Sequence, residues 1–221
     1  KDSYFEAAIM YSLGRKCNFI GQDLRMVGFS QAADNNKTPI LNTLREWLSN
    51  SELVLEIGSG SGQHAIHVAN VLQKIRWQPT EHPNALPTLM NNISNFGGPN
   101  ILAPQSLDLA AEEWPSGPVD CVYSANVIHI VEQTLGRKLI QTAAENLRVG
   151  GLLALYGPFK YRGGFTTTSN AEFDNWLKDR NPNSGIRDFE WVMELAQDSG
   201  LRFIEDRSMP ANNQFLAFRR L

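Results

Sequence analysis

Cysteine is scarce in this chain. Only Cys17 and Cys121 occur among 221 residues, too few for the disulfide framework of a small secreted protein. Cys121 lies in an apolar stretch that reads as a buried strand, so a reduced core thiol is expected there. Residues 1–12 mix charged and apolar side chains and have no continuous signal-peptide core. Together these features predict a cytoplasmic location.

Long apolar runs and an excess of positive charge are also absent. No stretch approaches the roughly 20 apolar residues that span a bilayer, so no membrane association is expected. The formal net charge is −3 and the isoelectric point is about 5.8. This balance argues against a broad phosphate-binding face, and no nucleic-acid partner is expected.

Several catalytic motifs are missing as well. The sequence has neither a Gly-x-Ser-x-Gly nucleophile elbow nor a phosphate-loop Lys-Ser/Thr pair. His64 and His67 would share one helix face, but no further ligand stands at metal spacing, so no metal is expected. No Asn-Pro-Pro-Tyr-like motif follows the predicted strand 119–124, which counts against methylation of amino groups on nucleic-acid bases.

What the sequence does contain is an alternation of strand-like and helix-like segments between residues 53 and 156. Short apolar runs predict strands at 53–57, 75–80, 101–107, 119–124 and 152–156. Helical spacing predicts helices from Pro39 to Leu48, at 65–72, at 86–93 and at 135–147, the last ending at Gly150 and Gly151. Strands that alternate with helices imply right-handed crossovers and a mainly parallel sheet.

The pattern changes after residue 156. Residues 157–168 are rich in Gly, Thr and aromatics and are expected to form a loop. Ser169 and Glu172 could form a capping box for one helix, and Asp188 could cap another. Alternation before and after Pro210 predicts an antiparallel hairpin with a long loop.

The predicted fold class is therefore α/β. We expect a doubly wound, mainly parallel, seven-stranded sheet that ends in a C-terminal antiparallel hairpin. This domain is expected over residues 34–221, preceded by a partly helical extension over residues 1–33.

The most informative segment is the glycine loop that follows the first predicted strand, residues 56–62. Its glycines permit a tight turn without Cβ obstruction, so that backbone and helix N–H groups can approach a ligand. A nicotinamide fingerprint would place its third glycine at position 63, which is Gln63. The spacing is instead Glu-x-Gly-x-Gly-x-Gly, which resembles the first motif of class I S-adenosylmethionine-dependent methyltransferases. A tight strand–helix turn without a ligand is the alternative interpretation.

A longer ordered set of motifs resembles one methyltransferase-like family, from about residue 32 to the end of the chain. That family was long catalogued as a domain of unknown function and includes methyltransferase-like 26. The motifs are Asn36-Lys37-Thr38-Pro39, Gly58-Ser59-Gly60-Ser61-Gly62-Gln63-His64, Trp77-Gln78-Pro79, Asn126-Val127-Ile128-His129, Tyr156-Gly157-Pro158-Phe159, Ser169-Asn170, Gly185-Ile186-Arg187-Asp188 and Met209-Pro210-Ala211-Asn212-Asn213. One departure is Thr80-Glu81-His82-Pro83, where the family usually has an acidic dipeptide region.

The resemblance implies a Rossmann-like fold and the cofactor S-adenosylmethionine. The residues it implies at the cofactor are Glu56, Gly58, Ser59, Gly60, Gly62, Gln63, Glu81, Asp108 and Asn126. Glu81 follows the second predicted strand, where an acidic residue can reach ribose hydroxyls. Asp108 could lie near the adenine amino group or simply cap a turn. Glu56 could order the glycine loop or meet the ammonium group of the cofactor.

Three residues are the candidate catalytic set: His129, Asn126 and Tyr156. Asn126 and His129 follow a strand on the carboxyl edge, where ligands bind in open α/β sheets. His129 could accept a proton or be a structural histidine, and Asn126 could orient cofactor or acceptor or cap a turn. Tyr156 ends the next strand and could form an aromatic wall or simply pack.

The acceptor itself is expected to be a small molecule. Weaker candidates for contacts to it are Tyr161, Arg162, Asn170, Arg187, Asn212 and Asn213. The rival hypotheses are a non-catalytic module that binds S-adenosylmethionine or its demethylated product, and a nicotinamide-dependent oxidoreductase. The sequence leaves the oligomeric state open.

Overall fold

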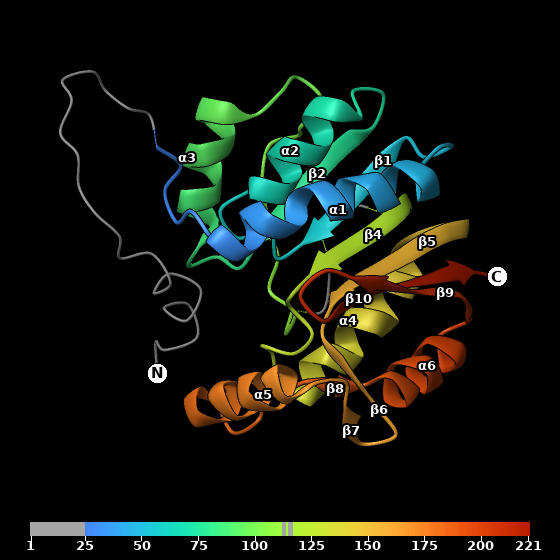
Figure 1. Cartoon of the computed structure of the whole chain (residues 1–221). Coiled ribbons are helices and arrows are strands. Elements are labelled where there is room, and N and C mark those ends of the chain that lie inside the picture. The colour runs from blue at the N-terminus through green and yellow to red at the C-terminus, as the bar shows by residue number, and fades with distance from the viewer. Residues whose placement is uncertain (1–24, 112–113, 115–116) are drawn as a thin grey trace, which may run out of the picture.

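The centre of the molecule is a seven-stranded sheet (Figure 1). The structure is a computed structural model, and it describes residues 25–111, 114 and 117–221. The strand order is β3-β2-β1-β4-β5-β10-β9. The strands are β1 (Leu53–Ile57), β2 (Arg76–Glu81), β3 (Gln105–Ser106), β4 (Val119–Ala125), β5 (Leu147–Gly157), β9 (Leu201–Met209) and β10 (Asn213–Arg220). Neighbours from β3 to β5 are parallel, and β10 is antiparallel to both β5 and β9. The predicted fold class is confirmed.

Helices cover both faces of the sheet. One layer holds α1 (Gln31–Trp47), α2 (Gln63–Val71) and α3 (Leu86–Phe96), and the other holds α4 (Gln133–Asn146) and α6 (Phe189–Asp198). Helix α5 (Thr168–Arg180) lies beside a small second sheet of β7 (Gly164–Phe165), β6 (Phe159–Tyr161) and β8 (Arg187–Asp188). In Figure 1 this second unit lies at the bottom of the molecule, away from α1 to α3.

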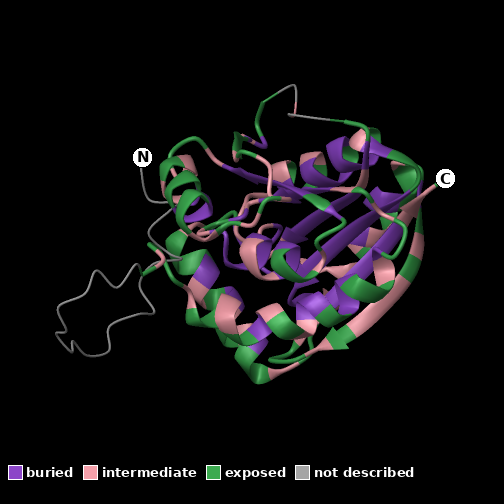
Figure 2. Cartoon of the chain, turned by 90° about the horizontal axis from the view of Figure 1, so that it is seen from above, coloured by how far each residue is buried: buried purple, intermediate pink, exposed green. Residues whose placement is uncertain are grey.

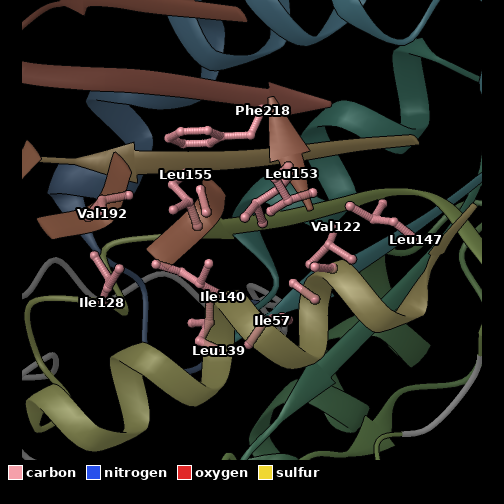
Figure 3. Packing of buried hydrophobic residues seen from close by; sticks show 14 of the residues in the cluster. Ile57, Val122, Ile128, Leu139, Ile140, Leu147, Leu153, Leu155, Val192 and Phe218 are labelled. Carbon is pink, nitrogen blue, oxygen red and sulfur yellow. The ribbon is translucent and has the colours of Figure 1, made fainter. Parts of the chain in front are cut away.

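The core is divided by the sheet into two apolar clusters. Consecutive residues of a strand point to opposite faces, so Leu153 and Leu155 pack toward α4 and α6, while Ala154 packs toward α1 and α2. Figure 3 shows the α4–α6 cluster, in which Phe218 of β10 lies near Leu155. The inner strands are mostly buried, apart from the start of β2 and residues 148–150 of β5, whereas the outer helix faces are exposed (Figure 2).

The first helix begins earlier than predicted. It starts at Gln31, and Pro39 lies inside it rather than at its first turn. Its N-cap is Ser30, whose hydroxyl accepts a hydrogen bond from Ala33 N at 3.3 Å. A proline inside a helix has no N–H to donate, so the helix loses one backbone hydrogen bond at Pro39. The helix nevertheless continues through this position, and its apolar residues Ile40 and Leu44 are buried.

Two predicted boundaries around the sheet were wrong. The expected strand 101–107 reduces to Gln105–Ser106 and an isolated bridge between Ile101 and Trp77, since Pro104 cannot donate to the ladder. Helix α4 ends at Asn146, and β5 follows at once, so Gly150 and Gly151 do not end the helix. Gly150 lies within β5 at φ 81°, where the register against β4 shifts.

The region after β5 is more ordered than predicted. Residues 157–168 contain the β6–β7 hairpin instead of a loop. Thr167, not Ser169, caps α5, because its side chain accepts a hydrogen bond from Asn170 N. Asp188 stands at the N-cap position of α6, but its carboxylate accepts from Gly163 N and pairs with Lys160 instead of bonding the helix.

The C-terminal hairpin has a short loop of residues 210–212, because Ala211 and Asn212 adopt positive φ angles of 58° and 59°. This corrects the expected long loop. Cys121 is a free, buried thiol on β4, as predicted. Cys17 and most of the expected extension 1–33 lie outside the described residues. Within those residues, no helix is long and apolar enough to cross a membrane.

Candidate functional site

The glycine loop connects β1 to α2 at the carboxyl edge of the sheet. Gly58, Gly60 and Gly62 all have positive φ angles, of 70°, 58° and 84°. A Cβ on Gly58 would lie 2.5 Å from Val127 Cγ2, and one on Gly62 would lie 3.0 Å from Leu89 Cδ1. A Cβ on Gly60 would meet nothing within 4 Å. Two glycines therefore serve packing, while Gly60 leaves open space in which a ligand can approach the backbone.

Glu81 lies beside this loop, at the end of β2. Its Oε2 accepts a hydrogen bond from Gly60 N at 2.6 Å, and its Oε1 accepts one from His82 N at 2.8 Å. Burial raises the pKa of this carboxyl, and the two backbone hydrogen bonds oppose the rise. A carboxylate has about four lone-pair sites, so each oxygen retains the capacity to accept a ligand hydroxyl. The structure thus brings the predicted acid and the predicted loop together.

Glu56 lies underneath the loop, on β1. Its Oε2 accepts from Ser59 Oγ at 2.9 Å and from Trp77 Nε1 at 2.8 Å, and the side chain is buried. Burial raises its pKa to about 7, although both hydrogen bonds oppose the rise. Ser59 is fixed further, since its N donates to Thr80 O at 2.9 Å. Of the two roles open to Glu56, its position favours ordering the loop.

Gln63 holds a segment that precedes α1 against the loop. Its Oε1 accepts from Ser30 N at 2.6 Å, and its Nε2 donates to Ser30 O at 3.1 Å. Asn92 on α3 forms the same pair of hydrogen bonds with Val27: its Oδ1 accepts from Val27 N at 3.0 Å, and its Nδ2 donates to Val27 O at 2.8 Å. Asn92 Nδ2 also donates to Ser61 O at 2.9 Å. We call residues 27–30 the strap; its attachment to the glycine loop was not predicted.

Asp108 follows β3, the strand next to β2. Leu107 N donates to Glu81 O at 2.9 Å, so the two predicted acids end neighbouring strands. Asp108 Oδ1 accepts from Ala110 N at 2.8 Å, which closes a turn. The capping role is therefore present, and the half-buried carboxylate keeps its second oxygen for a ligand.

Asn126 and His129 lie together beyond the end of β4. Asn126 has a φ of 59°, and its N donates to Tyr156 O at 2.8 Å. A Cβ on Gly157 would lie 3.2 Å from His129 Nδ1 and 3.6 Å from Asn126 Oδ1. The absence of a side chain at Gly157 therefore makes room for both polar groups at the carboxyl edge.

The His129 imidazole is buried and electrically neutral. Its pKa is lowered to about 3, first by burial and then by the positive charge of Arg187. Its Nδ1 is buried without a hydrogen-bond partner in the part of the chain that the structure describes. The ring also packs against Phe173 on α5 in a T-shaped arrangement, with centroids 5.5 Å apart. A neutral imidazole has one lone pair that can accept a hydrogen bond.

The Tyr156 hydroxyl faces the opposite layer. Its ring packs on Phe215 at 5.7 Å within the α1–α2 cluster. Burial raises its pKa to about 12, and the amides of Asn36 and Asn213 oppose part of that rise. Those amides do not reach good bonding geometry, so within the described residues the hydroxyl stays unpartnered. The structure records no contact between this side chain and His129.

Most of the weaker acceptor candidates are engaged in holding the fold. Tyr161 donates to Asp206, Asn170 donates to Asn212 O, and the guanidinium of Arg187 donates to carbonyls of the chain. The Asn212 amide donates to Ser169 Oγ on α5 and the Asn213 amide to carbonyls of its own turn, while Arg162 is exposed at the tip of the β6–β7 hairpin.

A buried polar network beneath the loop was also missed. His64 Nε2 lies 2.7 Å from Asn36 Oδ1, and His64 Nδ1 lies 3.2 Å from the Tyr123 hydroxyl. Burial lowers the pKa of His64 to about 4. The only sequence signal was that Asn36 and His64 both occur in motifs quoted above. The network ties α1 to α2 and β4 by hydrogen bonds.

Solved structures with the same fold include methyltransferases. An O-methyltransferase family protein from Burkholderia thailandensis has a TM-score of 0.74 and 18% identity, over 86% of this chain and 57% of that chain. Human N-acetylserotonin methyltransferase, solved with S-adenosylmethionine, has a TM-score of 0.72 and 17% identity, over 86% and 53%. An O-methyltransferase family 2 protein from Planctomyces limnophilus, in complex with apigenin, has a TM-score of 0.68 and 14% identity, over 85% and 62%.

This chain has the Rossmann-like α/β fold that is also found in S-adenosylmethionine-dependent methyltransferases. It spans between half and two thirds of the length of those relatives. The family model described as "Protein of unknown function (DUF938)" matches residues 27–220. The chain therefore belongs to the DUF938 family.

Proposed function

We propose that this protein transfers a methyl group from S-adenosylmethionine to a small-molecule acceptor, as a cytoplasmic enzyme. The observation that carries the proposal is the pairing of the glycine loop with Glu81, joined at 2.6 Å beside the open space at Gly60. We also propose, on the motifs given above, that it is related to the methyltransferase-like 26 family.

The residues around the loop would hold the cofactor, which supplies an activated methyl group on a sulfonium. Gly60 allows close approach, Glu81 accepts ribose hydroxyls, and Asp108 offers its second oxygen to the adenine end. Glu56 and Ser59 keep the loop in shape from below. Asn126, in its left-handed conformation at the end of β4, would orient the cofactor or the acceptor.

His129 would act on the acceptor in its neutral form. Because burial disfavours the imidazolium, the ring offers a lone pair for a hydrogen bond from an attacking hydroxyl or amine. Holding the attacking atom in line and away from water supplies much of the catalysis in such displacements. The side chain is 1% exposed, which suits a small acceptor better than the surface of a folded macromolecule.

The test is calorimetric titration with S-adenosylmethionine and S-adenosylhomocysteine. We expect micromolar affinity, about −8 kcal/mol, weakened at least about tenfold by Glu81→Ala, since 1.4 kcal/mol corresponds to tenfold. The matched control is Glu194→Ala, an exposed glutamate on α6 that should bind as the wild type does. If the folded wild type binds neither compound, the proposed function is wrong.

A second candidate function is a non-catalytic module that binds the same cofactor or its demethylated product. The observation in its favour is that several acceptor candidates, among them Tyr161, Asn170 and Arg187, already form hydrogen bonds within the chain. Tight cofactor binding with no turnover in a broad screen of small alcohols, phenols, amines and thiols would favour it.

A further inference from the structure

Four consecutive backbone carbonyls of the turn after β4 are held by one segment far along the chain. Ile128 O accepts from Arg187 Nε at 3.1 Å, and His129 O accepts from Gly185 N at 2.9 Å. Ile130 O accepts from Ser184 Oγ, and Val131 O accepts from Arg187 Nη2. The turn 128–131, which carries the His129 imidazole, is therefore bonded at each carbonyl to residues 184–187.

Arg187 is the central donor of this arrangement. It is half-buried, and among the residues that the structure describes no carboxylate forms an ion pair with it. Its guanidinium donates instead to three carbonyls, including Asn183 O at 3.0 Å. The planar guanidinium spreads its five N–H donors over three nitrogens and so reaches carbonyls at separate places, whereas the three donors of an ammonium group all lie on one nitrogen.

The segment 184–187 is itself anchored from α5. Asp174 Oδ1 accepts from Ile186 N at 2.7 Å, and its other oxygen pairs with Lys178 at 2.6 Å. A Cβ on Gly185 would lie 2.9 Å from Asp174 Oδ1, at a φ of 150° that side chains rarely adopt. Asp174 is buried, so this anchor does not move freely.

We propose that Arg187 is a positioning residue for His129. Through its fork it fixes the turn that carries the imidazole, so that Nδ1 stays beside Asn126 and Gly157. Arg187 touches neither the ring nor the glycine loop by any recorded hydrogen bond within the described residues, and it acts through the backbone. The inference rests on the proposed function for its catalytic meaning, but the positioning itself can be measured without a known acceptor.

The experiment compares the full-length wild type with Arg187→Lys and Arg187→Met. The readouts are the ¹⁵N resonances of the His129 imidazole, assigned by their loss in His129→Gln, and the affinity for S-adenosylhomocysteine. In the wild type we expect two well-separated ring resonances of one fixed tautomer. In both variants we expect that separation to narrow, because a released ring exchanges between its two neutral tautomers, while affinity changes by no more than about twofold, well below the tenfold that 1.4 kcal/mol represents.

Two further variants keep the test sharp. Ser184→Ala removes only the hydroxyl donor to Ile130 O and should cause a smaller change of the same kind. Arg202→Met, an exposed arginine on the far strand β9, should leave the imidazole resonances as they are. Thermal unfolding establishes that each variant is folded.

The outcomes separate the two proposals. If Arg187→Lys and Arg187→Met both fold and keep the wild-type resonances, the positioning role is overturned. If only Arg187→Met changes the resonances, then a positive charge at this position is sufficient and the forked hydrogen bonds are not required, so the proposal is likewise overturned. Failure of the wild type to bind S-adenosylhomocysteine would overturn the proposed function alone, since the resonances still decide the role of Arg187.

Discussion

At the scale of single residues, the glycine loop shows that one residue type serves two purposes. Gly58 and Gly62 are required because Val127 and Leu89 stand where their side chains would be. Gly60 has the same left-handed backbone but open space around it. Sequence spacing predicts three glycines at a ligand, and the structure distinguishes the one that a ligand can approach.

Replacement of Gly60 by valine should therefore abolish cofactor binding. The branched side chain would occupy the open space, and a left-handed conformation costs a residue with a Cβ about 1–2 kcal/mol. The matched control is Gly200→Val, since Gly200 has a φ of 75° and likewise no atom within 4 Å of its Cβ position, but lies between α6 and β9.

Thermal unfolding should show a similar loss of stability in both valine variants. Calorimetry should show that only Gly60→Val no longer binds S-adenosylmethionine. Wild-type affinity in Gly60→Val would show that the ligand lies elsewhere. Loss of binding in Gly200→Val as well would show that general destabilisation, not contact, is responsible.

At the scale of elements, the strap is the feature that sequence patterns did not reveal. Periodicity identifies α3 by its apolar face, but Asn92 looks like any polar helical residue. In the structure it is fully buried and bonds to both backbone groups of Val27 and to Ser61 O. Such bonds join segments 65 residues apart, which no local pattern encodes.

Loss of the Asn92 amide should release the strap from the glycine loop. For Asn92→Ala we expect faster hydrogen exchange of the Val27 amide and a stability loss of about 1–3 kcal/mol, because buried partners are left unsatisfied. Asn95→Ala is the control: it lies one turn along α3, is exposed and bonds only within the helix. Unchanged exchange at Val27 in Asn92→Ala would mean that the strap is held by other contacts.

At the scale of the whole molecule, the buried Glu56 couples global stability to pH. Its pKa of about 7 in the folded protein lies above the ordinary glutamate value of 4.5. The folded state therefore binds the proton more tightly than the unfolded state does. The resulting stabilisation is fully present below pH 4.5 and is lost as the pH rises through about 7.

We expect Glu56→Gln to remove this dependence while preserving acceptors for Ser59 and Trp77. Between pH 5 and 8 the wild type should lose about 2–3 kcal/mol relative to the variant. His64 and His129, whose pKa values are lowered, act with the opposite sign in both proteins, so they cancel in the difference. Chemical denaturation at several pH values measures the difference in free energy of unfolding between the two proteins. If their free energies of unfolding changed with pH in parallel, Glu56 would not be the source of the pH dependence.

The sequence by itself determined the order of the main-sheet strands and their helices, the sheet class and the place of the glycine loop, Glu81 and His129 in the chain, but not the small sheet of β6, β7 and β8. These follow from local periodicity and from turn chemistry, which neighbouring residues carry. Only the tertiary structure decided which glycine is open, where Tyr156 faces and what Gln63, Asn92 and Arg187 bind. The reason is physical: each of those roles is a contact between segments distant in sequence, and its geometry exists only once the sheet and its helices have packed.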